Sequence, residues 1–332
     1  MKHKYVIVGI AFLSALLMGG CGVINEDDPE NGFGLDPPGF PNTYWAPSVS
    51  ADGETIVFHR TKVTRLDASG VFWIDHDSTG IWMVRPDGSG FQFLMQGALN
   101  TPVVSPDGKW LAYEAGAQIF KVPFDGQAVD TTGIVQLTEE GRNFSPAWSP
   151  DGEWIAYDRS FVSPEPIKVM GTWIINTDSF YKKKISSYRS NPAWLSDSQN
   201  LLFVEASEGS FFKTNIHDTS IVKNVAFVQE VANNTIRYPK YSPDGSKIVF
   251  QSQKKGESRK IWVMNSDGTN PNPIADGAGY PSWTPNGRIV YMQGSPFPWD
   301  NIIEDYMAIW IMNADGSSKR QLTFNHGMEW TQ

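Results

Sequence analysis

Short apolar runs alternate with tight-turn signals along most of this chain, and one such unit organises the rest. Between residues 145 and 157 an extended segment carries the large apolar Trp148, a Pro-Asp-Gly stretch follows at 150–152, and an apolar, aromatic run occupies 154–157. Proline pre-sets one turn dihedral, aspartate bonds its own backbone, and glycine tolerates a positive φ. The pattern therefore predicts strand, tight turn and returning strand.

The same unit recurs along the chain at a nearly constant period. Its opening prolines are Pro47, Pro102, Pro146, Pro192, Pro239 and Pro281, separated by 55, 44, 46, 47 and 42 residues. Each copy continues into a third apolar run that ends in another turn, as at 261–268, and a fourth strand follows. Four short strands per roughly 40–50 residues is the pattern of a β-propeller blade. We predict an all-β fold, a six-bladed β-propeller of four-stranded antiparallel blades, over residues 44–332.

Two stretches depart from the repeat. In the fourth copy Asp197-Ser198 replaces Asp-Gly, and residues 211–218 lack a clean third-strand motif. Residues 327–331 resemble the opening of a seventh copy. The sequence leaves open whether this last segment closes the ring or is the remnant of a lost blade.

The repeated motifs Ser-Pro-Asp-Gly-x-x-Ile-x-Phe and Ile-Trp-x-Met-Asn-x-Asp-Gly resemble the repeats of TolB-type β-propellers, over about residues 44–332. The resemblance implies a six-bladed propeller in the bacterial envelope. TolB-type proteins also carry an α/β domain before the propeller, and only residues 22–43 separate Cys21 from Tyr44 here. We therefore expect the resemblance to concern the propeller module and not the partners of TolB-type proteins.

The N-terminus has the pattern of a targeting segment. Lys2 and Lys4 precede the apolar run 5–18, which fits a secretory signal and is short for a transmembrane helix. Gly19-Gly20-Cys21 then resembles a bacterial lipoprotein cleavage site, at which the cysteine becomes the first residue and carries lipid. We predict a lipoprotein signal peptide at 1–20 and lipidation of Cys21, with an ordinary signal peptide as the alternative. Cys21 is the only cysteine, so no intrachain disulfide forms.

Residues 21–43 are predicted to be a tether, because acidic residues, glycines and Pro37-Pro38 favour an extended chain. The acidic residues also resemble surface-export signals, which is a second interpretation. Gly22 is not the aspartate that resembles an inner-membrane retention signal. The expected location is the cell envelope, lipid-anchored, at the outer membrane, either periplasmic or surface-exposed.

The net charge and the absence of several motifs argue against some classes of function. The formal net charge is −9 and no long basic run occurs, so the chain lacks the electrostatic footprint of a nucleic-acid binder. His-Glu-x-x-His, Cys-x-x-Cys, Gly-x-Ser-x-Gly and phosphate-binding glycine motifs are absent from the sequence. The repeated aspartates are interpreted as turn residues, the repeated tryptophans as core, and His76 between Asp75 and Asp77 as part of a polar loop. We expect no catalytic residue, metal or cofactor.

Insertions fall between the second and third strands, at 61–80, 160–171, 207–211 and 294–307. In a propeller these connections share one face, and loops on a rigid scaffold commonly carry function. Aromatic residues gather in these connections, and aromatic side chains are frequent binding anchors. The predicted partner-binding residues are Phe72, Trp73, Phe161, Phe211, Phe297, Trp299 and Tyr306. The alternative is that these rings fold back and cover the ends of the blades.

These observations favour a monomeric envelope lipoprotein whose propeller is a non-catalytic scaffold for binding other envelope proteins. Two alternatives stay open. A glycan-binding surface lipoprotein would use exposed aromatic platforms. A polysaccharide lyase or hydrolase would need an acid pair in the funnel of the propeller, and some pectin-degrading lyases have related propellers. The sequence does not name the partner.

Overall fold

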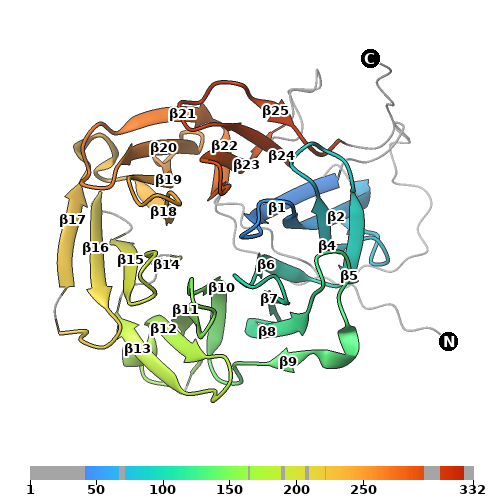
Figure 1. Cartoon of the computed structure of the whole chain (residues 1–332), viewed down its shortest axis with the longest axis horizontal. Coiled ribbons are helices and arrows are strands. Elements are labelled where there is room, and N and C mark those ends of the chain that lie inside the picture. Colours follow the sequence, from blue (N-terminus) through green and yellow to red (C-terminus); the bar gives the residue numbers. More distant parts are fainter. Residues whose placement is uncertain are drawn as a thin grey trace. The chain divides into compact units, whose positions relative to one another are not determined.

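The computed structural model describes residues 42–66, 72–163, 165–187, 191–205, 209–220, 222–294 and 307–324 of the 332-residue chain. In this part of the chain, six antiparallel sheets of consecutive strands follow one another around a common axis (Figure 1). All six belong to one compact unit. The predicted all-β, six-bladed propeller of four-stranded blades is confirmed.

The strands of the first three blades follow in chain order, from the axis outward. Blade one contains β1 (Asn42–Val49), β2 (Ile56–Leu66), β4 (Gly80–Val84) and β5 (Gln92–Gln96), and the short β3 (Phe72–Ile74) pairs with β2 beyond the blade. Blade two contains β6 (Leu99–Val104), β7 (Trp110–Ala115), β8 (Gln118–Pro123) and β9 (Val135–Gln136). Blade three contains β10 (Arg142–Trp148), β11 (Trp154–Ser160), β12 (Gly171–Asn176) and β13 (Lys182–Ser186).

The second half of the ring repeats this arrangement. Blade four contains β14 (Ala193–Trp194), β15 (Asn200–Glu205), β16 (Ser210–Asn215) and β17 (Val222–Phe227). Blade five contains β18 (Thr235–Tyr241), β19 (Lys247–Gln253), β20 (Lys260–Asn265) and β21 (Asn272–Asp276). Blade six contains β22 (Ala278–Trp283), β23 (Arg288–Gly294), β24 (Met307–Asn313) and β25 (Arg320–Gln321). Short 3₁₀ helices η1 (Thr131–Gly133), η2 (Ile167–Val169) and η3 (Gln229–Val231) lie in connections.

Apolar side chains pack between neighbouring blades. Ile119 and Leu137 of blade two, for example, form one buried cluster with Ile155 and Tyr157 of blade three, and Trp148 packs against it. Tryptophans of the inner strands also donate their indole N–H to the backbone of the preceding blade. These bonds run from Trp148 to Val103 O, from Trp194 to Ala147 O and from Trp283 to Lys240 O, at 3.3, 2.9 and 3.0 Å. The predicted core role of these repeated tryptophans is confirmed.

Blade six closes the ring on blade one by packing. Tyr44 and Phe58 of blade one share a buried cluster with Ile309 and Leu322 of blade six. Arg320 donates hydrogen bonds from its guanidinium to the backbone oxygens of the β4–β5 turn, Pro86 O and Asp87 O. Residues 327–331, which resembled a seventh repeat, lie outside the described residues.

The turns between first and second strands are held by their own side chains. In blade five Ser242 Oγ donates to Asp244 Oδ1 at 2.5 Å and accepts from Lys247 N at 2.9 Å. Asp244 Oδ1 accepts from Ser246 N at 3.0 Å, and these bonds lower the pKa of Asp244 to about 2. The same Ser–Asp bond occurs in the corresponding turns of blades one, two and three, and blade six uses Thr284 and Asn286. The interpretation of these aspartates as turn residues is confirmed.

Each inner strand contains a residue with left-handed backbone directly before its proline. These residues are Ala46, Thr101, Ser145, Asn191, Tyr238 and Tyr280, with φ of 47°, 46°, 54°, 58°, 54° and 52°. In blades one, two, three, five and six the pairing register shifts at this point. A residue before proline prefers the extended region, and a left-handed non-glycine residue costs roughly 1–3 kcal/mol. Neighbouring groups must therefore hold these six residues in place.

A side chain of the preceding blade supplies part of this support. It belongs to the residue that follows the buried aromatic of the second strand, and its oxygen accepts the N–H of the left-handed residue. The pairs are Glu114 with Ser145, Asp158 with Asn191 at 2.8 Å, and Gln251 with Tyr280 at 3.2 Å. In blade one His59 Nδ1 instead donates to Leu99 O of blade two at 2.6 Å. The equivalent residues of blades four and six, Val204 and Met292, have apolar side chains.

The first prediction concerns the left-handed glycine of a turn. Gly245 has a φ of +71°, and no other atom lies within 4 Å of the place that a Cβ would occupy, so only backbone strain opposes a side chain there. Gly245→Ala should lower the free energy of unfolding by about 1 kcal/mol. Urea denaturation measures it. Gly294→Ala is the control, because that glycine also has open space but no left-handed φ; equal losses in both variants would contradict the explanation.

The second prediction concerns the pH dependence of stability. Burial raises the pKa of Glu114 to about 7, against roughly 4.3 in an unfolded chain. The stabilisation from holding this proton is complete below about pH 4.3 and is lost as the pH rises to about 7. In Glu114→Gln the side chain stays neutral, so the wild type should lose roughly 3 kcal/mol relative to the variant over this interval.

Urea denaturation of both proteins at several pH values between 4 and 8 measures this difference. Glu139→Gln, at an exposed carboxyl, is the control and should follow the wild type. Parallel curves for the wild type and Glu114→Gln would show that Glu114 ionises normally in the folded protein.

Candidate functional site

The inner strands surround a cavity of about 80 Å³ on the axis of the propeller. Every left-handed residue and every proline of the inner strands contributes to its wall. The strained backbone therefore lies where the six blades converge. Strained backbone of this kind is common at functional sites.

The wall of this axial cavity differs from one side to the other. Tyr238 and Tyr280 of neighbouring blades stack with ring centroids 4.2 Å apart and an angle of 30° between the rings. On the other side the left-handed residues are Thr101, Ser145 and Asn191, and Asn191 Nδ2 donates to Ser145 Oγ at 2.8 Å. The Thr101 hydroxyl is buried and has no hydrogen-bond partner. The cavity thus has an aromatic wall and a polar wall.

One charged residue, Lys240, lines this cavity directly after its proline. Its Nζ donates to Ser282 Oγ of blade six at 3.2 Å. Burial lowers the pKa of the Lys240 ammonium to about 8. The residues that follow the proline in the other blades are small or uncharged: Ser48, Val103, Ala147, Ala193 and Ser282.

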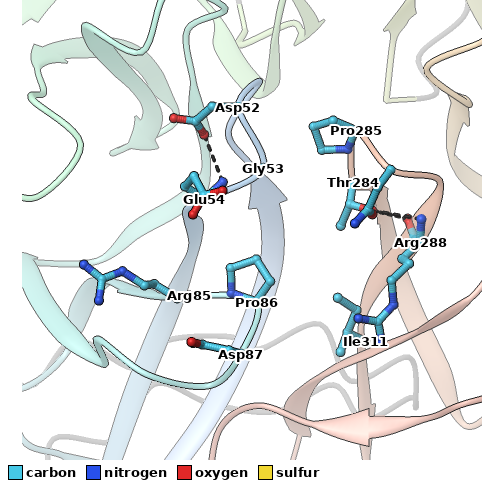
Figure 2. A pocket seen from close by; sticks show the side chains of 11 residues that line it. Asp52, Gly53, Glu54, Arg85, Pro86, Asp87, Thr284, Pro285, Arg288 and Ile311 are labelled. Carbon is cyan, nitrogen blue, oxygen red and sulfur yellow. Dashed lines mark hydrogen bonds between the residues drawn. The ribbon is translucent and has the colours of Figure 1, made fainter.

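A second cavity, of about 280 Å³, lies between blades one and six on the side of the Pro-Asp-Gly turns. Figure 2 shows Asp52, Glu54 and the Arg85–Asp87 turn on one side of it, and Thr284, Pro285 and Arg288 on the other. Arg288 Nε is buried without a hydrogen-bond partner. The cavity is therefore a charged cleft at the seam where the ring closes.

Two carboxylates of this seam cleft, those of Asp52 and Asp87, form hydrogen bonds within turns. Asp52 accepts from Ser50 Oγ at 2.5 Å and from Glu54 N at 3.0 Å. Asp87 accepts from Ser89 N at 2.9 Å and from Ser89 Oγ at 2.7 Å. These bonds lower the pKa of both carboxyl groups. Groups that stay ionised near neutral pH are poor proton donors, so Asp52 and Asp87 are poorly suited to general acid catalysis.

The binding residues predicted from the sequence do not form one site in the described structure. Phe297, Trp299, Tyr306 and the lipidation residue Cys21 lie outside the described residues. Phe72 and Trp73 lie in β3, opposite Leu66 and Arg65 of the extended β2, and Phe161 is half-buried after β11.

Phe211 was predicted to be a loop aromatic, and this is wrong. It lies in β16, is completely buried, and packs edge-on against Phe250 of blade five with ring centroids 5.0 Å apart. The fourth repeat has a shorter connection than the sequence suggested, because its third strand begins at Ser210. The ring is part of the core between blades four and five.

The His–Asp loop beside β4 is a hydrogen-bonded turn. Asp75 forms an ion pair with Lys62 at 2.9 Å and accepts from Ser78 Oγ and Asp77 N, both at 3.0 Å, whereas His76 is exposed. Among the described residues no group of histidine, cysteine, aspartate and glutamate side chains is arranged to hold a metal ion. Within the same residues no helix is long and apolar enough to cross a membrane.

The axial cavity was missed by the reasoning from sequence. The opening prolines were recognised as strand signals, but not as the residues that converge on the axis. A signal was available in Lys240, since a lysine follows the proline in this repeat alone among the six.

Solved structures with the same fold have diverse names. TolB from Acinetobacter baumannii has a TM-score of 0.56 at 16% identity, over 83% of this chain and 77% of that chain. An oligogalacturonate lyase from Vibrio parahaemolyticus has a TM-score of 0.51 at 14% identity, over 88% and 80%. A Mycobacterium tuberculosis puromycin-hydrolyzing peptidase has a TM-score of 0.53 at 13% identity, over 87% of this chain and 54% of that chain. At such identities the likeness shows the fold alone.

A curated relative matches a short segment. The uncharacterized peptidase YuxL of Bacillus subtilis (strain 168) is 29% identical over 55 residues, which is 16% of this chain and 8% of the relative. The chain thus spans less than a tenth of the length of that relative.

The family profile covers far more of the chain. The profile of the TolB beta propeller domain matches residues 140–324, more than half of the 332 residues. The match runs from the start of blade three to the end of blade six. On this evidence of sequence and fold, the chain belongs to the TolB beta propeller domain family.

Proposed function

We propose that this chain is a lipid-anchored cell-envelope protein whose propeller is a non-catalytic scaffold for another envelope protein. The observation that carries the proposal is the contrast between the two kinds of connection. The turns between first and second strands are short, and those of blades one, two, three and five are closed by their own Ser–Asp hydrogen bonds. The connections between second and third strands vary in length and composition, as binding loops on a rigid scaffold do.

The β11–β12 connection supports this surface best among the described residues. Val162 and Ile167 are 45% and 69% exposed, and Phe161 beside them is half-buried. In blade one the corresponding connection extends β2 and forms the β2–β3 pairing. Exposed apolar side chains gathered on one face are typical of interaction surfaces.

An enzyme is the second candidate, and Glu114 is the observation that favours it. A half-buried carboxyl with a pKa of about 7 is suited to proton transfer near neutral pH. The Ser145 N–H bond gives Glu114 a structural role that accounts for its burial. A glycan-binding surface protein would instead use aromatic platforms such as Tyr181, which is 59% exposed.

The third prediction tests the lipid anchor. Cys21→Ser should release the protein from membranes, because after signal cleavage the lipid is the expected strong apolar anchor. Fractionation of membranes and soluble envelope contents, followed by immunoblotting, measures the distribution. Membrane association equal to that of the wild type would rule out lipidation of Cys21 as the anchor.

The fourth prediction tests the binding face. Ile167→Asp, and separately the triple alanine variant of Trp73, Trp299 and Tyr306, should each weaken partner binding by about thirtyfold, roughly 2 kcal/mol, with little change in melting temperature. Cross-linking and affinity capture from envelope membranes identify the partner, and titration with the purified partner measures affinity.

Ile134→Asp is the matched control, since Ile134 is also exposed but lies in a third-to-fourth strand connection. A melting temperature lowered by many degrees in the triple variant would mean that these rings are structural. If Ile134→Asp alone weakened binding, the partner would dock on the opposite face.

A further inference from the structure

We infer that the axial cavity is a binding site for a carboxylate group, held by the ammonium of Lys240 and by the hydroxyl of Thr101 on the opposite wall. Such a site goes beyond the proposed scaffold function. It does not depend on the lipid anchor or on which face binds a protein.

The charge of Lys240 is uncompensated within the described structure. An ammonium has three hydrogen atoms to donate, and the hydrogen bond of this one goes to the neutral Ser282 hydroxyl. Burial is the cause of its lowered pKa, and among the described residues no carboxylate forms an ion pair with it. Lys240 is half-buried, and a charge that is partly removed from water without an ion-pair partner is unfavourable, so a ligand of opposite charge would be stabilised there.

The contrast with other lysines in the propeller supports this assignment. Lys121 donates to Thr177 O at 2.9 Å and lies over the ring of Trp110, and Lys183 donates to Ile216 O at 2.6 Å. Both of these lysines bridge one blade to the next through a backbone oxygen. Lys240 also reaches the next blade, but its acceptor is the side-chain hydroxyl of Ser282 and not a backbone oxygen, and Lys240 lies in the wall of the cavity.

The hydroxyl of Thr101 gives support that is independent of charge. Thr101 Oγ1 is buried, lines the same cavity and has no hydrogen-bond partner. Buried hydroxyls in folded proteins nearly always have a partner, so an unsatisfied one in a cavity wall indicates a ligand or a bound water. Thr101 lies in blade two and Lys240 in blade five, three blades apart in a ring of six and hence on opposite sides of the axis.

Size and wall chemistry select the ligand class. A cavity of about 80 Å³ is larger than the space that a single bound water needs and suits a small group such as a carboxylate. The prolines have no N–H to offer, and the stacked Tyr238 and Tyr280 present ring surface. A carboxylate attached to a small apolar group therefore fits better than a highly hydrated multivalent anion. Such a group is found in free organic acids and at the C-terminus of a peptide chain.

The experiment is calorimetric titration of the full chain at pH 7 and constant ionic strength with three ligands. These are acetate, acetyl-trialanine with a free C-terminal carboxylate, and the C-terminal amide of the same peptide. Acetate or the free-acid peptide should bind saturably with one site per chain, and the amide should not bind. Lys240→Met should weaken this binding at least tenfold, and Thr101→Val should weaken it several-fold.

Lys247→Met is the matched control, because it removes an exposed lysine from the next strand of the same blade. Its binding should equal that of the wild type. Lys240→Met should not melt at a lower temperature, since it removes a half-buried charge that has no ion-pair partner among the described residues. Acetate at saturating concentration should raise the melting temperature of the wild type but not that of Lys240→Met.

The relative affinities of the ligands identify the occupant. A peptide acid that binds more than tenfold tighter than acetate would support the site and identify a chain end as its occupant, whereas equal affinities would support the site and identify a free acid. The inference is overturned if neither carboxylate binds saturably, if Lys240→Met binds as the wild type does, or if Lys247→Met loses as much affinity. The two proposals can fail separately. If Ile167→Asp or the triple alanine variant bound acetate normally but lost the protein partner, the carboxylate site would be unaffected. If Lys240→Met lost acetate binding but kept the protein partner, the scaffold function would be unaffected.

Discussion

The propeller depends on holding a left-handed residue before each proline of its inner strands. That conformation is unfavourable for residues as large as Tyr238 and Tyr280, and the neighbouring blade offsets part of the cost. Gln251 accepts the N–H of Tyr280, and Asp158 accepts the N–H of Asn191. Inner-strand tryptophans donate hydrogen bonds to the backbone of the preceding blade. Blades two, three and five therefore each support the axial backbone of the next blade, and residues of all six blades form the wall of the cavity.

This mutual support is uneven around the ring. Val204 and Met292 replace the polar acceptor in blades four and six, so the junctions to blades five and one rely on packing and other bonds. At the closing junction Arg320 reaches the backbone of the β4–β5 turn, and a buried aromatic cluster around Tyr44 joins the first and last blades. Among the described residues no strand is shared between the first and last blades. The ring is therefore closed by contacts and hydrogen bonds of side chains.

Two ionisable residues near the axis, Glu114 and Lys240, have different roles. Glu114 is half-buried and hydrogen-bonded, so its raised pKa reflects the desolvation cost of ionising a carboxyl that supports the backbone. Lys240 is half-buried beside a neutral hydroxyl, and the unsatisfied hydroxyl of Thr101 lies across the axis. The first arrangement is complete within the protein, whereas the second is complete only with an external anion. The axis therefore combines a structural carboxyl in blade two with a ligand-directed lysine in blade five.

The sequence by itself determined the blade, because Pro-Asp-Gly turns and short apolar runs are local signals whose period is set by the four strands of each repeat. It did not determine which side chains of different blades contact one another. Phe211 reads as a loop aromatic but lies in the core, since its burial depends on Phe250 of the next blade. Lys240 and Thr101 are 139 residues apart and share a cavity only because six inner strands converge on one axis. Side-chain roles that arise from contacts between blades were decided by the tertiary structure alone.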